Sequence, residues 1–193
     1  MLRIISFEGI DGSGKTTVAN MVYQRLKNRF SSKNIVLTRE PFTNEITSLI
    51  EKSGWKDPIA LTLLFAADRA YHLRELINQN PDVILMDRYI YSSITYQSAL
   101  GIEENWIETV NSKFPKPVLT ILLDISPNKA LQRIQKNDKF NFKEKIESLT
   151  IVREKYLELA RREKNIVMVN AEKSLNDVVE EVYSIIYSYL LTL

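Results

Sequence analysis

The chain has 193 residues, and its 26 Lys and Arg against 24 Asp and Glu leave a net charge of only +2. Proteins built mainly to bind nucleic acid usually carry a concentrated basic stripe, so we expect no nucleic-acid partner. The chain has no cysteine, which excludes disulfides, thiolate metal sites and a cysteine nucleophile. Its start lacks a signal-peptide pattern, and no apolar run is long enough for a membrane span. We therefore expect a cytoplasmic protein with no membrane partner.

The predicted elements alternate between short apolar runs and longer amphipathic stretches. Strands are predicted at residues 2–7, 35–38, 83–86, 118–123 and 166–169, each nearly all apolar, as in strands covered on both faces. Long helices are predicted at residues 16–30, 59–77 and 146–160. A last helix follows Ser174, whose hydroxyl can cap it together with Asp177. This alternation predicts a single α/β domain over residues 1–193, with a five-stranded parallel sheet and helices on both faces.

Two stretches allow more than one interpretation. Residues 135–145, QKNDKFNFKEK, form a polar, lysine-rich interruption. This segment is either a short lid at the join of two helices or a solvated helix face. The apolar side of the helix between Leu61 and Leu76 belongs either to the core or to a subunit contact.

The segment GIDGSGKTT, just after the first strand, matches the phosphate-loop pattern G-x-x-x-x-G-K-[ST]. Glycines let the backbone turn tightly and point its N–H groups at an anion, and the following helix directs the positive end of its dipole there. Lys15 adds a movable charge for the outer phosphates of ATP, and Thr16 offers a hydroxyl to Mg²⁺. We therefore predict a three-layer P-loop fold. The predicted ATP-binding loop is formed by Gly9, Ile10, Asp11, Gly12, Ser13, Gly14, Lys15, Thr16 and Thr17.

The sequence VILMDRY places Asp87 and Arg88 where the third predicted strand ends. Open α/β folds bind their ligands at this edge of the sheet. A carboxylate there can hold Mg²⁺, so Thr16 and Asp87 are the predicted metal ligands. Arg88 can neutralise charge on a transferring phosphate. A GTPase is disfavoured, because NKAL at residues 128–131 lacks the acid of the guanine-binding N-K-x-D motif.

Four blocks resemble the thymidylate kinase family: FEGIDGSGKTT, TREP, LLFAADR and DRYIYSSITYQ. They occur in the order of that family and near its spacing. The resemblance extends to YLELA and NIVMVNAEKSLNDVVEEV, and so covers nearly the whole chain. It implies transfer of the ATP γ-phosphate to dTMP, giving dTDP and ADP for dTTP synthesis. It also implies Mg²⁺ as cofactor and a homodimer as the usual assembly.

The resemblance assigns contacts with dTMP to two of these blocks. Phe65 lies four residues before Arg69, so on a helix both share one face. A ring there can stack on thymine, and a guanidinium can donate to its O4. Ser93 and Gln97 match positions that bind the thymine edge, and Tyr96 matches a residue that crowds the 2′ position of the sugar. From the residues alone, Phe65 would be a core side chain and Tyr96 half-buried packing.

The resemblance also assigns roles around the phosphates. Asp11 would reach the 3′-OH of the acceptor, although a carboxylate repels the phosphates themselves. Arg39 and Arg88 would bind the acceptor phosphate. Arg133 would lie against the adenine of ATP, although it could equally be a surface arginine. Because the acceptor is already a phosphate dianion, no strong general base is needed, and His72 is expected to be structural. The predicted catalytic residues are Lys15, Arg88 and Asp87.

Two departures from the family pattern concern arginines. Members approach the phosphates with an arginine placed either in the phosphate loop, where this chain has Gly12, or in the lid. The lysine-rich segment 135–145 contains no arginine, so either a lid lysine replaces it or Arg88 and Lys15 suffice with slower chemistry. We expect Lys139 or Lys143 to close over ATP. Bacterial members commonly have a phosphate-binding arginine where this chain has Thr47. The predicted lid residues are Lys136, Lys139 and Lys143.

Two other functions stay open. A kinase for another pyrimidine nucleotide or for a deoxynucleoside would share the phosphate loop, but a nucleoside kinase needs a base that accepts the hydroxyl proton. A non-catalytic nucleotide-binding module could also have kept the loop. The intact set of Lys15, Thr16, Asp87 and Arg88 argues against that module.

Overall fold

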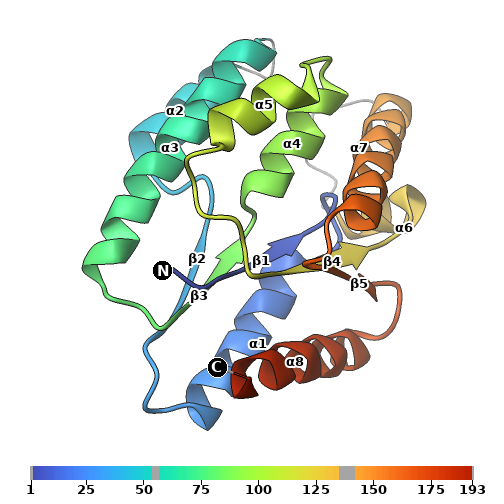
Figure 1. The fold of residues 1–193 in the computed structure, drawn as a ribbon. Coiled ribbons are helices and arrows are strands. Elements are labelled where there is room, and N and C mark those ends of the chain that lie inside the picture. The colour runs from blue at the N-terminus through green and yellow to red at the C-terminus, as the bar shows by residue number, and fades with distance from the viewer. Residues whose placement is uncertain (1, 54–56, 135–141, 193) are drawn as a thin grey trace.

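The structure, a computed structural model, describes residues 2–53, 57–134 and 142–192. Within this part, five parallel strands form a sheet in the order β2-β3-β1-β4-β5 (Figure 1). The central β1 pairs with β3 on one side and β4 on the other, so the loop after β1 begins at the middle of the sheet. The strands are β1 (Ile4–Glu8), β2 (Ile35–Arg39), β3 (Val83–Asp87), β4 (Leu119–Asp124) and β5 (Ile166–Asn170).

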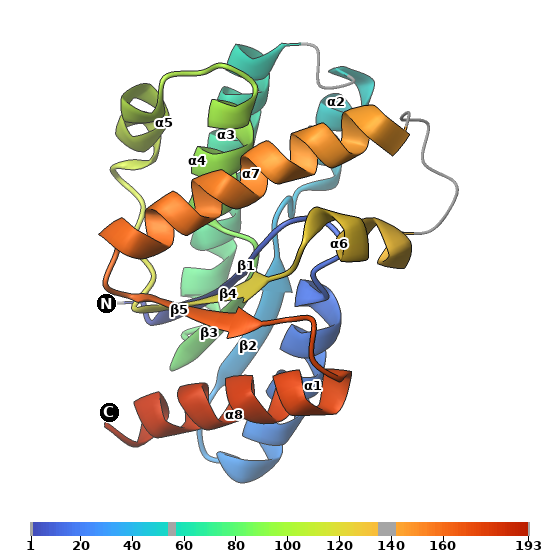
Figure 2. The same cartoon turned by 90° about the vertical axis from the view of Figure 1, so that its right-hand side faces the viewer.

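Helices cover both faces of the sheet and so complete the predicted three-layer α/β fold. Figures 1 and 2 show α1 and α8 packed together on one face, with α3, α4, α5 and α7 on the other. Among the described residues, no helix is both long and apolar enough to cross a membrane. The helices are α1 (Lys15–Arg29), α2 (Asn44–Ser53), α3 (Pro58–Asn78), α4 (Ile90–Ala99), α5 (Glu104–Asn111), α6 (Pro127–Arg133), α7 (Phe142–Arg162) and α8 (Leu175–Leu191).

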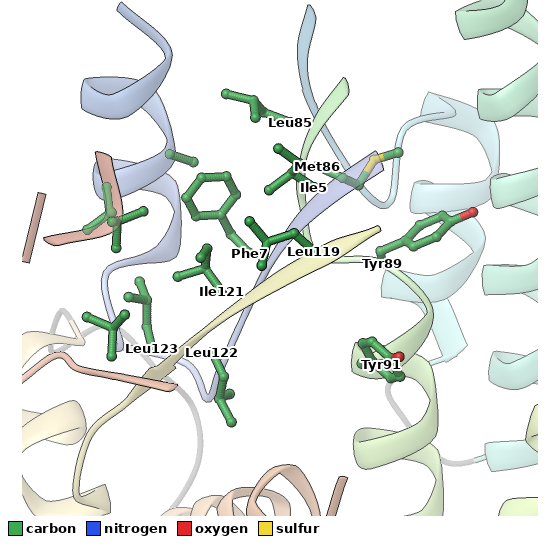
Figure 3. Close-up of a cluster of buried hydrophobic side chains, with 14 of the residues drawn as sticks. Ile5, Phe7, Leu85, Met86, Tyr89, Tyr91, Leu119, Ile121, Leu122 and Leu123 are labelled. Carbon is green, nitrogen blue, oxygen red and sulfur yellow. The ribbon is translucent and has the colours of Figure 1, made fainter. Parts of the chain in front are cut away.

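The core lies between the central strands and the two helix layers. Side chains of β1, β3 and β4 gather there, with Phe7 on the α1 side of the sheet and Tyr89 and Tyr91 on the other side (Figure 3). Every residue of β1 and β3 is buried, because successive side chains point to opposite faces and both faces are covered. This packing buries the central strands on both faces, and the loops that follow them begin directly at the buried strand ends.

Every predicted strand runs one residue further than its apolar pattern indicated. The last residue of each strand is polar or charged, but its backbone still pairs with the neighbouring strand. The carboxyl edge of the sheet therefore carries a row of polar groups, at the edge where this fold binds ligands. These terminal residues are Glu8, Arg39, Asp87, Asp124 and Asn170.

The long helices match the prediction, and Ser174 caps α8 by accepting a hydrogen bond from the Asp177 N–H at 3.2 Å. The shorter α2, α4, α5 and α6 were not predicted. The helix α4 is buried on several sides, and polar residues such as Thr95 interrupt its apolar pattern, so helical periodicity is hidden. Most of the predicted lid, residues 135–141, lies outside the described part of the chain.

Candidate active site

The phosphate loop connects the buried end of β1 to the start of α1. Gly9 and Gly14 have φ angles of 139° and 93°, which side-chain-bearing residues rarely adopt. A β-carbon on Gly9 would lie 2.6 Å from the carbonyl oxygen of Leu123, so the close approach of the loop to β4 also requires glycine. The loop thereby wraps around the N-terminus of α1, where unpaired backbone N–H groups favour an anion.

Lys15 is the first residue of α1, and its side chain is folded over the loop. Its ammonium group donates to the carbonyl oxygens of Gly9 at 2.8 Å and Ile10 at 2.9 Å. Burial, reinforced by the nearby charge of Arg88, lowers the pKa of Lys15 from 10.5 to about 7. A phosphate placed in the loop would stabilise the charged form, so this lysine is suited to bind an anion.

Thr16 and Asp87 bring two oxygen ligands together from separate elements. The Thr16 hydroxyl at the start of α1 donates to the Asp87 carboxylate at the end of β3 over 2.6 Å. No group of three or more His, Asp or Glu side chains suited to a metal occurs in the described ranges. Mg²⁺ does not require one, because it commonly uses one or two protein oxygens together with phosphates and waters. The pair therefore fits a phosphate-bound Mg²⁺.

Arg88 follows Asp87 directly and has a φ angle of 68°, in the left-handed region. Its guanidinium forms an ion pair with Asp11 of the phosphate loop and lies 5.2 Å from the ring centroid of Tyr96. The Asp11 N–H donates to the Tyr96 hydroxyl at 3.1 Å. Burial raises the pKa of Tyr96 to about 12, so this hydroxyl stays neutral at physiological pH. Arg88 is thereby held next to the phosphate loop.

A cavity of about 290 Å³ opens beside these residues. Asp11 and Arg88 form its phosphate-loop end, and residues of α2, α3 and α4 form the rest of its wall together with Glu40 and Pro41 after β2 and Tyr89 before α4. The lining residues that the sequence analysis predicts to bind dTMP are Asp11, Phe65, Arg69, Arg88, Ser93, Tyr96 and Gln97. Further lining residues are Glu40, Pro41, Thr47, Ile50, Glu51, Tyr89 and Ser92.

The far end of the cavity contains a buried guanidinium. Arg69 is 1% exposed, and it pairs with Glu40 through Nε at 2.9 Å and Nη2 at 2.5 Å. Its Nη2 also donates to Ser93 at 3.1 Å, and its Nη1 donates to the side-chain oxygen of Asn111. A guanidinium has five N–H groups, so one on Nη1 remains for a ligand. The charge is balanced by Glu40, which makes Arg69 a fixed hydrogen-bond donor.

The family model for thymidylate kinase matches residues 7–182. The chain is 62% identical over 189 residues to a probable thymidylate kinase of Sulfolobus acidocaldarius, with 97% of each chain covered. It is 55% identical to the corresponding protein of Sulfurisphaera tokodaii, again with 97% of each covered. The crystal structure of thymidylate kinase from Ehrlichia chaffeensis superposes with a TM-score of 0.74 at 26% identity, covering 96% of this chain and 98% of that one.

The chain belongs to the thymidylate kinase family. Thymidylate kinases transfer a phosphate from ATP to dTMP and give dTDP, a step towards dTTP. The resemblance in the sequence blocks and the predicted fold are thereby confirmed. The phosphate loop and the 290 Å³ cavity lie side by side, and the ion pair of Asp11 with Arg88 joins them.

The cavity of the kinase brings together seven of the eight residues predicted for dTMP. Arg39 is the exception, because it is exposed at the end of β2 and does not line the cavity. Gln97 is 1% exposed, and its side-chain oxygen has no hydrogen-bond partner, so this polar group is available to a ligand. Phe65 is half-buried in the wall and is not a pure core side chain. Thr47 also lines the cavity.

The predicted adenine residue lies apart from this cavity. Arg133 at the end of α6 is exposed, and its Nη2 donates to the carbonyl oxygen of Ala171 at 3.0 Å, which ties α6 to the loop after β5. The predicted lid residues Lys136 and Lys139 lie outside the described residues, as does the side chain of Lys143.

His72 has a structural environment, as expected. It is fully buried, its Nε2 lies 2.7 Å from the Thr38 hydroxyl, and its ring stacks on Phe42 with centroids 4.3 Å apart. These contacts hold the chain that leads from β2 into α2.

Sequence reasoning did not identify three polar residues of the site: Glu8, Glu40 and Asn111. Glu40 lies in the TREP block, but its burial, on which its pairing with Arg69 depends, is not visible in the sequence. Asn111 is the last residue of α5, far from every motif, and nothing in its local sequence indicates a role.

Proposed function

We propose that this chain phosphorylates dTMP with ATP through the residues gathered at the carboxyl edge of the sheet. The phosphate loop holds the β- and γ-phosphates of ATP, with Lys15 turning from the loop carbonyls to the outer phosphates. Thr16 and Asp87 would hold Mg²⁺, which would offset the charge of the phosphates. Arg133 contacts the adenine end.

The acceptor occupies the 290 Å³ cavity. Phe65 stacks on thymine, while Arg69 donates its remaining N–H to O4, and Ser93 and Gln97 face the base edge. A donor at this point favours thymine over cytosine, whose amino group would face another donor. Tyr96 limits space at the 2′ position of the sugar.

The observation that carries this assignment is the ion pair between Asp11 and Arg88. Asp11 belongs to the ATP loop, and Arg88 projects into the acceptor cavity, so the pair marks the point where the two substrates meet. Arg88 binds the acceptor phosphate there and neutralises charge during transfer, and Asp11 reaches the 3′-OH. Catalysis then consists of alignment and charge neutralisation, without a general base.

A panel of acceptors tests the assignment. ADP release from ATP is measured with dTMP, dUMP, dCMP, UMP and thymidine. We expect a higher kcat/KM for dTMP than for dCMP or UMP, because Gln97 and Arg69 would recognise the O4 and N3–H edge of thymine and Tyr96 disfavours a ribose. Uracil shares that edge, so dUMP measures the contribution of the thymine methyl group. A preference for thymidine would assign a nucleoside kinase, and ADP release with none of the five would favour a binding module.

The protein also acts as a homodimer in the cytoplasm under this proposal. The large side chains of Ile59, Leu63 and Ile77 are 55%, 49% and 59% exposed, and with Ala70 they lie along one side of α3. A continuous apolar helix stripe on the surface favours contact with a second copy.

Light scattering on Leu63→Glu tests the dimer. We expect a dimer for the parent and a monomer for this variant, because the charge would be buried in the contact. Ile151→Glu on α7 is the matched control, since Ile151 is similarly exposed at 45% and lies away from the stripe. A monomeric parent protein would contradict the proposal.

A further inference from the structure

Glu8 is a buried carboxylate that the proposed mechanism does not use. It is the last residue of β1, it is fully buried, and it does not line the acceptor cavity. A buried charge is costly unless hydrogen bonds satisfy it. Glu8 has three such bonds: with the Tyr89 N–H at 2.9 Å, the Ser92 hydroxyl at 2.7 Å and the Tyr156 hydroxyl at 2.9 Å.

Two of these bonds lead directly to Arg88. The Arg88 N–H donates to the carbonyl oxygen of Phe7, and the next N–H, that of Tyr89, donates to Glu8. Both peptide groups that flank the left-handed Arg88 backbone are therefore held by the end of β1. A non-glycine residue persists in that conformation only where its surroundings impose it.

The second bond reaches the guanidinium. Ser92 donates its only hydroxyl hydrogen to Glu8, which turns the oxygen of that hydroxyl towards Arg88, and Arg88 Nη1 donates to it at 3.2 Å. Tyr156 of α7 donates to the same carboxylate, so Glu8 also connects α7 to the site. All three partners donate to Glu8 in this arrangement, which suits an ionised carboxylate, although burial raises the pKa of Glu8.

We propose that Glu8 is a positioning residue for phosphoryl transfer, which fixes the backbone of Arg88 through Tyr89 N–H and its guanidinium through Ser92. This inference rests on the proposed role of Arg88 at the acceptor phosphate. A displacement of about 1 Å in a substrate-positioning group can cost on the order of 100-fold in rate. Loss of Glu8 therefore changes transfer and acceptor binding but leaves ATP binding intact.

The test is a double-mutant cycle with Glu8→Gln and Arg88→Lys. We expect Glu8→Gln to lower kcat for dTMP by about 10- to 100-fold, with the Kd for ATP changed less than twofold. In the Arg88→Lys background, Glu8→Gln should have almost no further effect, because the group that it positions is already altered. Ser92→Ala should lower kcat for dTMP by part of the same factor, and this effect should likewise vanish in the Arg88→Lys background. It replaces Glu8→Gln in the cycle if Glu8→Gln folds poorly.

Ser6→Ala is the matched control, since Ser6 is a fully buried hydroxyl on the same strand that bonds Thr120 at 2.7 Å. It should lower the melting temperature without coupling to Arg88. Equal rate losses from Glu8→Gln in both backgrounds would assign Glu8 a purely structural role and overturn the inference. Unchanged kinetics in Arg88→Lys and Arg88→Ala would instead refute the role of Arg88, and the inference with it.

Discussion

The carbonyl oxygen of Ala130 in α6 occupies the space that a β-carbon on Gly12 would need. Gly12 also has a φ angle of 82°, so both sterics and backbone conformation exclude a side chain. Family members that carry an arginine in the phosphate loop have it just after the acid, at the place of Gly12. In this chain the contact between the loop and α6 leaves no room for it.

Gly12→Ala should therefore destabilise the protein more than a glycine replacement that only strains the backbone. Gly101→Ala is the control, because Gly101 has a φ angle of 91° but no atom within 4 Å of its added β-carbon. We expect Gly101→Ala to cost about 1–2 kcal/mol of unfolding free energy, and Gly12→Ala to cost clearly more and to weaken ATP binding. Denaturant titration and calorimetric ATP binding measure both effects. Equal losses of unfolding free energy in the two variants would show that α6 shifts at little cost to accommodate the added β-carbon.

Asp11→Ala should weaken binding of dTMP but leave binding of 3′-deoxythymidine monophosphate nearly unchanged. The carboxylate is proposed to accept a hydrogen bond from the 3′-OH, and a bond to a charged group contributes about 1.5–3 kcal/mol. The ratio of the two affinities, measured by calorimetry, should fall by about tenfold or more in the variant. An unchanged ratio would show that Asp11 does not bind the 3′-OH of the acceptor.

Glu40→Gln should strongly destabilise the fold, because it leaves the charge of Arg69 buried and uncompensated. The side chains of Arg69 and Glu40 are 1% and 3% exposed, and breaking such a pair costs about 3–5 kcal/mol. Glu180→Gln is the control, since the pair of Glu180 with Arg25 is exposed and should contribute less than about 1 kcal/mol. Urea unfolding measures the loss of unfolding free energy in each variant. Similar small losses in both would contradict the claim that Glu40 compensates a buried charge on Arg69.

Glu172 should make stability depend on pH in the acid range. Its hydrogen bonds with Lys129 at 2.6 Å and the Ser126 N–H at 3.0 Å lower the pKa of Glu172 from 4.5 to about 2. A carboxyl with a lowered folded-state pKa stabilises the fold above its unfolded pKa, and this contribution disappears as pH falls through the folded value. The difference in unfolding free energy between parent and Glu172→Gln should therefore be constant above pH 4.5 and shrink towards pH 2. If the difference in unfolding free energy stayed unchanged down to pH 2, the pKa of Glu172 would not be lowered by folding in the way described.

The sequence determined the layers of this protein and its phosphate loop. The apolar runs gave the parallel sheet, because strands covered on both faces must be apolar throughout. The pattern from Gly9 to Thr17 gave the phosphate loop, because few residue types allow that turn and bind phosphate. Both signals are local, and so they can be found along the chain.

Tertiary structure alone decided how the cavity beside the phosphate loop is built. Glu40, Asn111 and Glu8 are far from one another in sequence and belong to no common motif, but packing of α5 and α4 against the sheet brings them to Arg69 and Arg88. Their roles come from burial, which makes an isolated charge costly and so forces it to find partners. Burial results from the whole assembled chain, and no short segment carries a signal for it.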